Sequence, residues 1–254
     1  MKIIGMIILL IGCFILWQHF ELKKFRITSY EYQTDKITQS VNFAVVADLH
    51  AHVYGRDNDI LIQKIKEQKP DMILVPGDMI VSRYPETYET AYQAVKKLTE
   101  IAPVYFSNGN HESRVSKVPV MQTEAFLEYE NRVRKLGVHI LNNASEEVIL
   151  HGGKFCISGL EIPLECYGKG SYEPLPEHFI QEALGEAKKD AVQILLAHNP
   201  MFAKEYADWG ADITVCGHTH GGLVRIPGIG SVISPQFELF PKYDAGEFEF
   251  DGKK

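Results

Sequence analysis

Polar residues that can bind metal ions follow five apolar segments of this chain, each at the point where the apolar segment ends. A single histidine at such a place is usually a structural residue, but five of the ten histidines of the chain belong to these clusters. We therefore expect the five clusters to form one site. They are Asp48-x-His50, Gly77-Asp78, Gly109-Asn110-His111-Glu112, His198-Asn199-Pro200 and Gly217-His218-Thr219-His220.

The donor types in these clusters indicate which metals could bind. Carboxylate, imidazole and amide donors together suit manganese, iron or zinc, whereas an all-oxygen set would favour Ca²⁺ or Mg²⁺. Asp78 is suited to bridge two cations, because one carboxylate offers two oxygens and two close cations need shared negative charge. Glycine at positions 77, 109 and 217 lets the backbone turn sharply beside the ligands. The sequence therefore predicts two divalent metal ions, Mn²⁺, Zn²⁺ or iron as Fe²⁺ or Fe³⁺.

The apolar segments of the first half alternate with amphipathic helices, which is typical of a mostly parallel sheet with helices on its faces. In such sheets the carboxyl ends of the strands form the ligand crevice, so clusters far apart in sequence meet there. The predicted strands of this half are 41–47, 72–76 and 103–107, and the predicted helices are 58–68, 85–100 and 121–136.

Short strands in the second half predict a second sheet, which begins with a hairpin that turns at 151–154. Neither a repeat nor a linker divides the sequence, so we expect one α/β domain over residues 23–254. The predicted strands of this half are 138–141, 147–150, 155–160, 193–197 and 212–216. One predicted helix follows residue 176 and ends at about residue 188, and another covers 201–208.

From roughly residue 41 to 244 the sequence resembles the calcineurin-like metallophosphoesterases, because all five clusters occur in the order of that family. The resemblance implies a four-layer αββα sandwich with two mixed β-sheets flanked by helices. It also implies that His111 is the catalytic residue that serves the leaving group. The metal ligands that it implies are Asp48, His50, Asp78 and His220 for one ion, and Asp78, Asn110, His198 and His218 for the other.

The same resemblance implies hydrolysis of phosphoester bonds by a hydroxide formed between the two metals, without a covalent enzyme intermediate. Residues 217–222 and the apolar N-terminus are most similar to the bacterial membrane-associated phosphodiesterase branch, which includes enzymes acting on lipid-linked diphosphates. We therefore expect a phosphodiesterase or pyrophosphatase whose substrate is a phosphorylated small molecule or lipid. Glu112 is expected to orient a histidine.

Other functions stay open at this point. A noncatalytic membrane-anchored scaffold would keep the fold, although such scaffolds commonly lose metal ligands and none is lost here. A phosphomonoesterase or nucleotide phosphodiesterase acting on soluble substrates is less compatible with the apolar N-terminus. A protein phosphatase is disfavoured, because those enzymes carry an acidic residue and an arginine just after the bridging aspartate, where this sequence has Asp78-Met79-Ile80-Val81-Ser82-Arg83.

An apolar run of 15 residues from Ile3 to Trp17 opens the chain, with Lys2 before it and three basic residues between 23 and 26 after it. The run is shorter than the roughly 20 residues that a spanning helix prefers, but flanking lysines can extend such a span by reaching the interface. We therefore expect residues 1–22 to form an uncleaved single-pass anchor in the cell membrane, with the side of the membrane left open. A cleaved signal peptide is the alternative.

The net charge and the C-terminus bear on partners and on completeness. A formal net charge of −7 and a pI near 5.8 argue against nucleic acid as a partner. The chain stops at Lys254, whereas the resembled branch continues with a further strand, so we expect a truncated C-terminus with an exposed sheet edge. The sequence does not indicate an oligomeric state.

Overall fold

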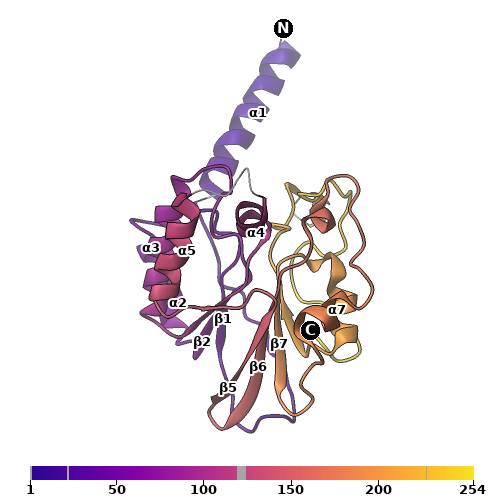
Figure 1. Cartoon of the computed structure of the whole chain (residues 1–254). Helices are drawn as coiled ribbons and strands as arrows, with labels where there is room; N and C mark the ends of the chain where they lie inside the picture. Colours follow the sequence, from indigo (N-terminus) through magenta and orange to yellow (C-terminus); the bar gives the residue numbers. More distant parts are fainter. Residues whose placement is uncertain (1, 22, 119–123, 227) are drawn as a thin grey trace.

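Two four-stranded sheets face each other in the computed structural model, which describes residues 2–21, 23–118, 124–226 and 228–254 (Figure 1). The first sheet has the order β1-β2-β3-β4 and all its neighbouring strands are parallel. The second has the order β5-β6-β7-β8, with β5 antiparallel to β6 and the other pairs parallel. The strands are β1 (Phe43–Val45), β2 (Met72–Val75), β3 (Val104–Phe106), β4 (His139–Ile140), β5 (Ala144–Leu150), β6 (Gly153–Leu160), β7 (Val192–Ala197) and β8 (Ile213–Val215).

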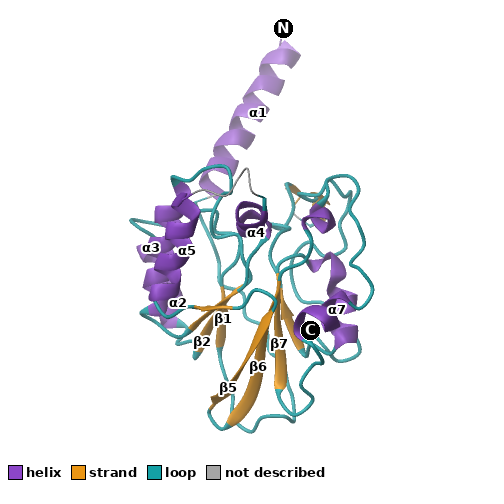
Figure 2. Ribbon diagram, in the orientation of Figure 1, coloured by secondary structure: helices purple, strands orange, loops and turns teal. Residues whose placement is uncertain are grey.

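Helices cover the outer face of each sheet, as Figure 2 shows by colour. The helices α2 (Asp59–Glu67), α3 (Thr87–Thr99) and α5 (Glu124–Lys135) pack on the first sheet. The second sheet is covered by α6 (Phe179–Leu184), α7 (Ala203–Trp209) and the short 3₁₀ helices η1 (Leu164–Tyr167) and η2 (Pro200–Phe202).

Strand β2 explains why the two sheets lie face to face. Its four residues are all buried, and successive side chains of a strand point to opposite faces. Ile73 and Val75 join the core between the first sheet and its helices, whereas Met72 and Leu74 join a second core with side chains from the other sheet. A strand that is apolar on both faces must be covered on both faces, which fixes β2 in the middle of the molecule.

The expected α/β fold is confirmed, with four differences from the sequence-based prediction. The strand predicted over 138–141 was expected in the second sheet, but it joins the first sheet as β4. The first sheet is wholly parallel rather than mixed, because each of its strands returns to the next through a helix on one face. A helix α4 (Asn110–Lys117) and a hairpin of β9 (Val224–Ile226) and β10 (Gly230–Ile233) were not expected. The predicted start of the helix over 121–136 lies partly outside the described residues, at 121–123.

The N-terminal apolar run forms the helix α1 (Lys2–Glu21), which projects away from the two sheets (Figure 1). Among the residues that the structure describes, no helix has the length and apolar character needed to cross a bilayer. The expected membrane anchor at residues 1–22, and with it the cell-membrane localisation, is therefore wrong. A physical reason is length, because 15 apolar residues at about 1.5 Å each cover about 22 Å of a hydrocarbon core roughly 30 Å thick.

The backbone of Lys254 forms two hydrogen bonds with residues 212 and 214, at the edge of the second sheet. The amide of Thr214 donates to the carbonyl of Lys254 at 2.6 Å, and the amide of Lys254 donates to the carbonyl of Asp212 at 3.0 Å. The edge of β8 is thus occupied at these residues, in contrast to the exposed edge that we expected.

Candidate metal centre

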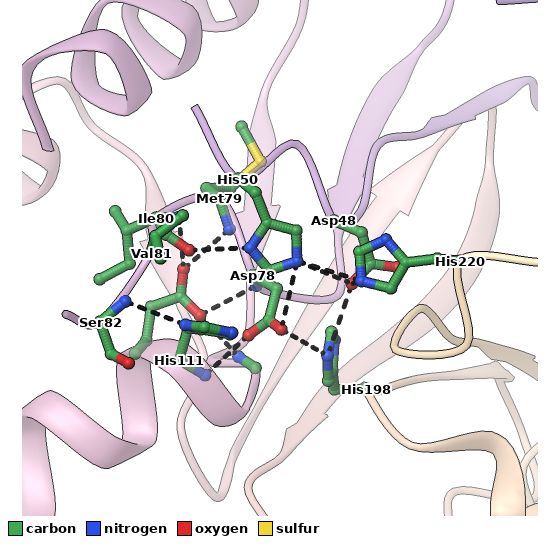
Figure 3. A network of polar contacts seen from close by, with 12 residues as sticks. Asp48, His50, Asp78, Met79, Ile80, Val81, Ser82, His111, His198 and His220 are labelled. Carbon is green, nitrogen blue, oxygen red and sulfur yellow. Dashed lines mark hydrogen bonds and ion pairs between the residues drawn. The ribbon is translucent and has the colours of Figure 1, made fainter. Parts of the chain in front are cut away.

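The loops that follow the strands bring all the predicted histidine and aspartate ligands together. Figure 3 shows five of them, which are Asp48, His50, Asp78, His198 and His220. Asp48 and His50 follow β1, Asp78 follows β2 and His198 follows β7 directly, while Asn110 opens α4 after β3. The ligand atoms fall into three overlapping groups, each within 4.8 Å: Asp48, His50 and His220; His50, Asp78 and His111; and Asp78, His198 and His218.

Asp78 lies where the groups meet. Its Oδ2 is 3.1 Å from Nε2 of His198 and 3.7 Å from Nε2 of His50. Its other oxygen, Oδ1, accepts a hydrogen bond of 2.8 Å from the amide of His111. One oxygen of this carboxylate thus faces both sets of donors, rather than each oxygen facing one set.

Four atoms of the centre that could bind a metal ion are buried and make no hydrogen bond to any described residue. Leaving a buried polar group without a hydrogen bond costs roughly 1–3 kcal/mol, so such atoms normally have a partner. A metal ion satisfies donors of this kind, and the mixture of carboxylate, amide and imidazole fits a transition metal. The donors are Asp48 Oδ1, Asn110 Oδ1, His198 Nε2 and His218 Nε2.

Backbone carbonyls orient two of the histidines. Nδ1 of His198 lies 2.7 Å from the carbonyl of Pro76, and Nδ1 of His50 lies 3.1 Å from the carbonyl of Ile80. Because a carbonyl only accepts, each Nδ1 carries a proton, and Nε2 is the nitrogen left to face a metal. Both carbonyls belong to the segment around Asp78, so one loop orients ligands from two other strands.

The backbone is strained at five of the predicted ligands, which adopt left-handed φ angles that non-glycine residues rarely occupy. Conformations of this kind cost of order 1–3 kcal/mol each and concentrate at functional sites. The φ angles are 52° at Asp48, 45° at His50, 55° at Asp78, 70° at His218 and 52° at His220.

We had expected Glu112 to orient a histidine. Its carboxylate instead holds the loop of Asp78 through hydrogen bonds from backbone amides. Its carboxylate accepts hydrogen bonds from the amides of Asp78 and Met79 at 2.9 Å each, from Ile80 at 3.3 Å and from Gly109 at 3.1 Å. Burial, together with the nearby charge of Asp78, raises the pKa of Glu112 to about 7. The buried carboxylate therefore ties the loop after β2 to the start of α4.

All three glycines predicted to give close approach do so, because a side chain at Gly217 would overlap the carboxylate of Asp48. A side chain at Gly109 would overlap the carboxylate and amide of Asp78, and one at Gly77 would overlap the backbone of Gly109. Gly77 also has a φ of 94°, which favours glycine. The loops carrying Asp78 and Asn110 can therefore touch only because both positions lack a Cβ.

Burial and charge set opposite protonation preferences within the centre. Although burial opposes its charged form, the neighbouring His198, His111 and His50 lower the pKa of Asp78 below its usual range. Burial also disfavours charge on His198, but the Asp78 carboxylate outweighs it and raises the pKa of His198. Burial lowers the pKa of His218 to about 3, so this ring stays neutral and its lone pair is available.

His111 lies beside the ligand groups, with its ring edge-on to His50 at 4.8 Å between centroids (Figure 3). The amide of Ser82 donates a hydrogen bond of 2.9 Å to Nδ1 of His111. Burial lowers the pKa of His111 to about 4, despite the opposing charge of Asp78. The ring is therefore neutral, and because Nδ1 accepts, its proton sits on Nε2.

The two ligand sets differ in exposure. The side chains of His50 and His220 are 21% and 39% exposed, whereas those of Asp78 and His198 are 2% and 0% exposed. The centre is therefore open to solvent on the side of His50 and His220.

Two residues near the centre were not found from the sequence. The ring of Tyr167 on η1 lies edge-on to His218 at 5.0 Å. The side-chain oxygen of Gln236 accepts a hydrogen bond of 3.2 Å from Nδ2 of Asn199, the residue after His198. Both lie outside the five ligand clusters, so the pattern that identified the other residues could not reveal them.

Comparison with known proteins agrees with this geometry. Residues 41–222 match the family described as calcineurin-like phosphoesterase. The chain is 27% identical over 169 residues to phosphodiesterase YaeI of Escherichia coli, covering 66% of this chain and 56% of that protein. It is 28% identical over 198 residues to the uncharacterized metallophosphoesterase YkuE of Bacillus subtilis, covering 75% of this chain and 62% of that protein.

Among solved structures, a 5'-nucleotidase precursor from Thermus thermophilus aligns with a TM-score of 0.45 and 14% identity, over 74% of this chain and 43% of that one. The family match alone spans most of the chain and contains all seven predicted ligands. The chain belongs to the calcineurin-like phosphoesterase family.

Proposed function

We propose that this chain hydrolyses phosphodiester or diphosphate bonds with the help of two metal ions. The observation that carries the proposal is a set of four buried atoms that make no hydrogen bond to any described residue, on Asp48, Asn110, His198 and His218. The family match supports phosphoester hydrolysis, and the relative named phosphodiesterase YaeI supports a diester as substrate.

Two sets of residues would hold the metals and share Asp78. When bound, such a pair of cations lowers the pKa of a water molecule and neutralises the charge that develops on phosphoryl oxygens. Asp78 supplies negative charge to both sets through Oδ2, which lies near His50 and His198. The first set is Asp48, His50, Asp78 and His220, and the second is Asp78, Asn110, His198 and His218.

In this proposal His111 serves the departing oxygen. Its Nδ1 accepts from the amide of Ser82, so the Nε2–H of the neutral ring is the group that can donate to the leaving oxygen. The amide of His111 donates to Oδ1 of Asp78, so the ring is held at a fixed position beside the shared carboxylate. A hydrogen bond that strengthens as charge develops favours the transition state over the bound substrate.

We further propose that the substrate carries an apolar group, as a lipid-linked phosphate would. Leu223 and Val224 follow His220 closely and are 57% and 50% exposed. Contiguous exposed apolar side chains that are rimmed by polar residues mark interaction or ligand-binding sites. Turnover of an alkyl diphosphate is expected to rise about tenfold between a short and a long chain, and Leu223→Ser should abolish that rise. Equal turnover of both substrates would exclude an apolar subsite.

The main test measures turnover of bis(p-nitrophenyl) phosphate and of p-nitrophenyl phosphate by metal-free and Mn²⁺-loaded protein. We expect metal-dependent cleavage with preference for the diester, and loss of cleavage in Asp78→Asn. The matched control is Asp190→Asn, which removes an exposed carboxylate bound to Lys154. Preference for the monoester would favour a phosphomonoesterase. Turnover no faster than that of Asp78→Asn would favour a noncatalytic scaffold.

A further inference from the structure

The loop that carries His218 and His220 is strained over most of its length. Left-handed φ angles occur at four of the residues from 218 to 222. Non-glycine residues in this conformation are energetically unfavourable and persist only where the surrounding structure holds them. The contacts of this loop therefore decide whether its two proposed ligands stay in place. The angles are 70° at His218, 52° at His220, 69° at Gly221 and 99° at Gly222.

The main chain attaches the start of this loop to the centre. The amide of Gly217 donates to the carbonyl of His198 at 2.9 Å, so the loop begins beside a ligand that follows β7. Further on, the amide of Thr219 donates to the carbonyl of Gly217 at 2.8 Å, and the amide of Gly222 donates to the carbonyl of Thr219 at 2.6 Å. These last two bonds close turns inside the loop and do not attach it to another part of the chain.

The side chain of Thr219 attaches the middle of the loop to a distant segment. Thr219 lies between the two ligands and is 8% exposed. Its Oγ1 donates a hydrogen bond of 2.9 Å to the carbonyl of Asp244, which is 25 positions further along the chain. Asp244 also lies beyond residues 41–222, the part that matches the family. The middle of the loop is thus tied to a residue outside the five ligand clusters.

The side chain of Asp244 reaches the end of the same loop through Arg225. Nη1 of Arg225 donates to Oδ2 of Asp244 at 2.7 Å and to the carbonyl of Gly221 at 3.0 Å. One Nη1 carries two N–H groups, so it can make both bonds at once. Oδ2 also accepts from the amide of Ser231 at 2.9 Å. Because a hydrogen bond between charged groups is stronger than a neutral one, the carboxylate holds the guanidinium against the residue that follows His220.

The segment that carries Asp244 is itself held in place. The other carboxylate oxygen, Oδ1, accepts from the amide of Ala245 at 2.8 Å. The preceding residue, Tyr243, is 8% exposed, and its ring lies 5.1 Å from that of Phe248 and 6.0 Å from that of Phe250. Aromatic pairs at such centroid distances pack favourably. Asp244 is therefore fixed by contacts other than those with the ligand loop, as an anchor for that loop has to be.

We propose that Asp244 is a positioning residue that holds the loop of His218 and His220 in its left-handed conformation, through Thr219 in the middle and through Arg225 at the end. The inference rests on the proposed two-metal function. Because His220 belongs to the first ligand set and His218 to the second, one anchor serves both metal positions. Residues that orient metal ligands typically change metal affinity by about 10–100-fold.

The first test titrates metal-free protein with Mn²⁺ by calorimetry, which separates the two binding events. Thr219→Val removes the hydroxyl at nearly the same shape, and we expect both events to weaken about 10–100-fold, because the loop supplies one ligand to each set. Thr219→Ser keeps the hydroxyl and should restore both events. The matched control is Thr99→Val, which removes a hydroxyl that donates to the carbonyl of Lys96 on α3 and should leave both events unchanged.

The second test breaks the other connection. Arg225→Met removes the donors and keeps the apolar stem, and because the Arg225 side chain is 49% exposed, this variant should fold even if Thr219→Val does not. We expect at least one binding event to weaken about 10–100-fold. The matched control is Arg132→Met, since Arg132 forms a similar ion pair with Glu89 between α5 and α3, and it should leave both events unchanged.

A third variant shows whether Asp244 acts through Arg225. Asp244→Ala should weaken the same event, and the double variant Asp244→Ala/Arg225→Met should bind no more weakly than Asp244→Ala alone, because residues that act as one unit are not additive. Wild-type titrations in Thr219→Val and Arg225→Met, additive losses in the double variant, or equal losses in Thr219→Ser and Thr219→Val would overturn the inference. Wild-type protein that binds fewer than two Mn²⁺ ions would instead overturn the proposed function on which it rests.

Discussion

The carboxylate of Glu112 accepts a hydrogen bond from the amide of Asp78 at 2.9 Å, and through it one buried side chain fixes the carboxylate that the two ligand sets share. The same carboxylate binds the amides of Met79, Ile80 and Gly109. The geometry of the centre therefore depends on a residue that would not touch a metal.

Replacing Glu112 by glutamine is expected to destabilise the metal-free protein by about 3 kcal/mol, because an amide group cannot accept from four N–H groups and adds a buried donor. The measurement is urea unfolding at pH 8, above the pKa of about 7 for this carboxyl. Glu128→Gln, on the exposed face of α5, is the control and should leave the unfolding midpoint unchanged. Equal midpoints for the two variants would show that the four hydrogen bonds contribute little.

Gly109→Ala is expected to lower turnover of bis(p-nitrophenyl) phosphate about 100-fold, since a Cβ there would displace the Asp78 carboxylate and misplacement of about 1 Å can cost that much. Gly12→Ala is the control, because no atom lies near the Cβ that it would add. Unchanged turnover of Gly109→Ala would mean that the position of Asp78 is not critical.

His111→Gln is expected to keep the metal content of the protein while lowering turnover by about 100-fold or more, the usual contribution of a general acid. The loss should be larger for alkyl phosphodiesters than for p-nitrophenyl diesters, because a poor leaving group depends more on a hydrogen-bond donor. Rates for a series of leaving groups measure this difference. The exposed His178→Gln is the control, and a uniform loss across the series would argue for a structural role of His111.

Much of the centre could be predicted from the sequence, because its ligands are marked by the residues next to them in the chain. Asp48, Asp78 and His198 each follow an apolar strand, and parallel strands bring their carboxyl ends to one edge. The role of Glu112 could not be predicted, because it depends on contacts with backbone amides 32–34 residues away. The same is true of Gln236, whose partners lie up to 70 residues away.

The sequence pattern also could not predict the backbone conformation at the ligands, and it led to a wrong membrane assignment for the N-terminal segment. Left-handed φ angles at Asp48 and His50 are imposed by hydrogen bonds from one loop to the next, such as the amide of Asp48 to the carbonyl of Gly77 at 3.1 Å. The apolar run before Trp17 indicated a helix correctly, but its length was over-interpreted as a membrane span. Helix α4 was missed because its start coincides with the polar ligand cluster at Asn110.

Removal of metal is expected to destabilise the folded chain, because donors that would bind cations become unsatisfied or protonated. Loading with Mn²⁺ at 100 times the dissociation constant should stabilise the protein by about 2.7 kcal/mol per site. Thermal unfolding with and without Mn²⁺ checks this, with Ca²⁺ as a comparison ion that imidazole donors disfavour. Equal stabilisation by both ions would argue against a histidine-rich site.

The most direct measurement of the central claim is the number of transition-metal ions bound per chain after equilibrium dialysis, determined by elemental analysis. Two ions in wild-type protein and in Asp190→Asn, with no more than one in Asp78→Asn, is the result we predict, because Asp78 is the carboxylate that both ligand sets share. Wild-type protein that takes up no transition metal, or Asp78→Asn protein that still takes up two ions with unchanged affinity, would contradict the account.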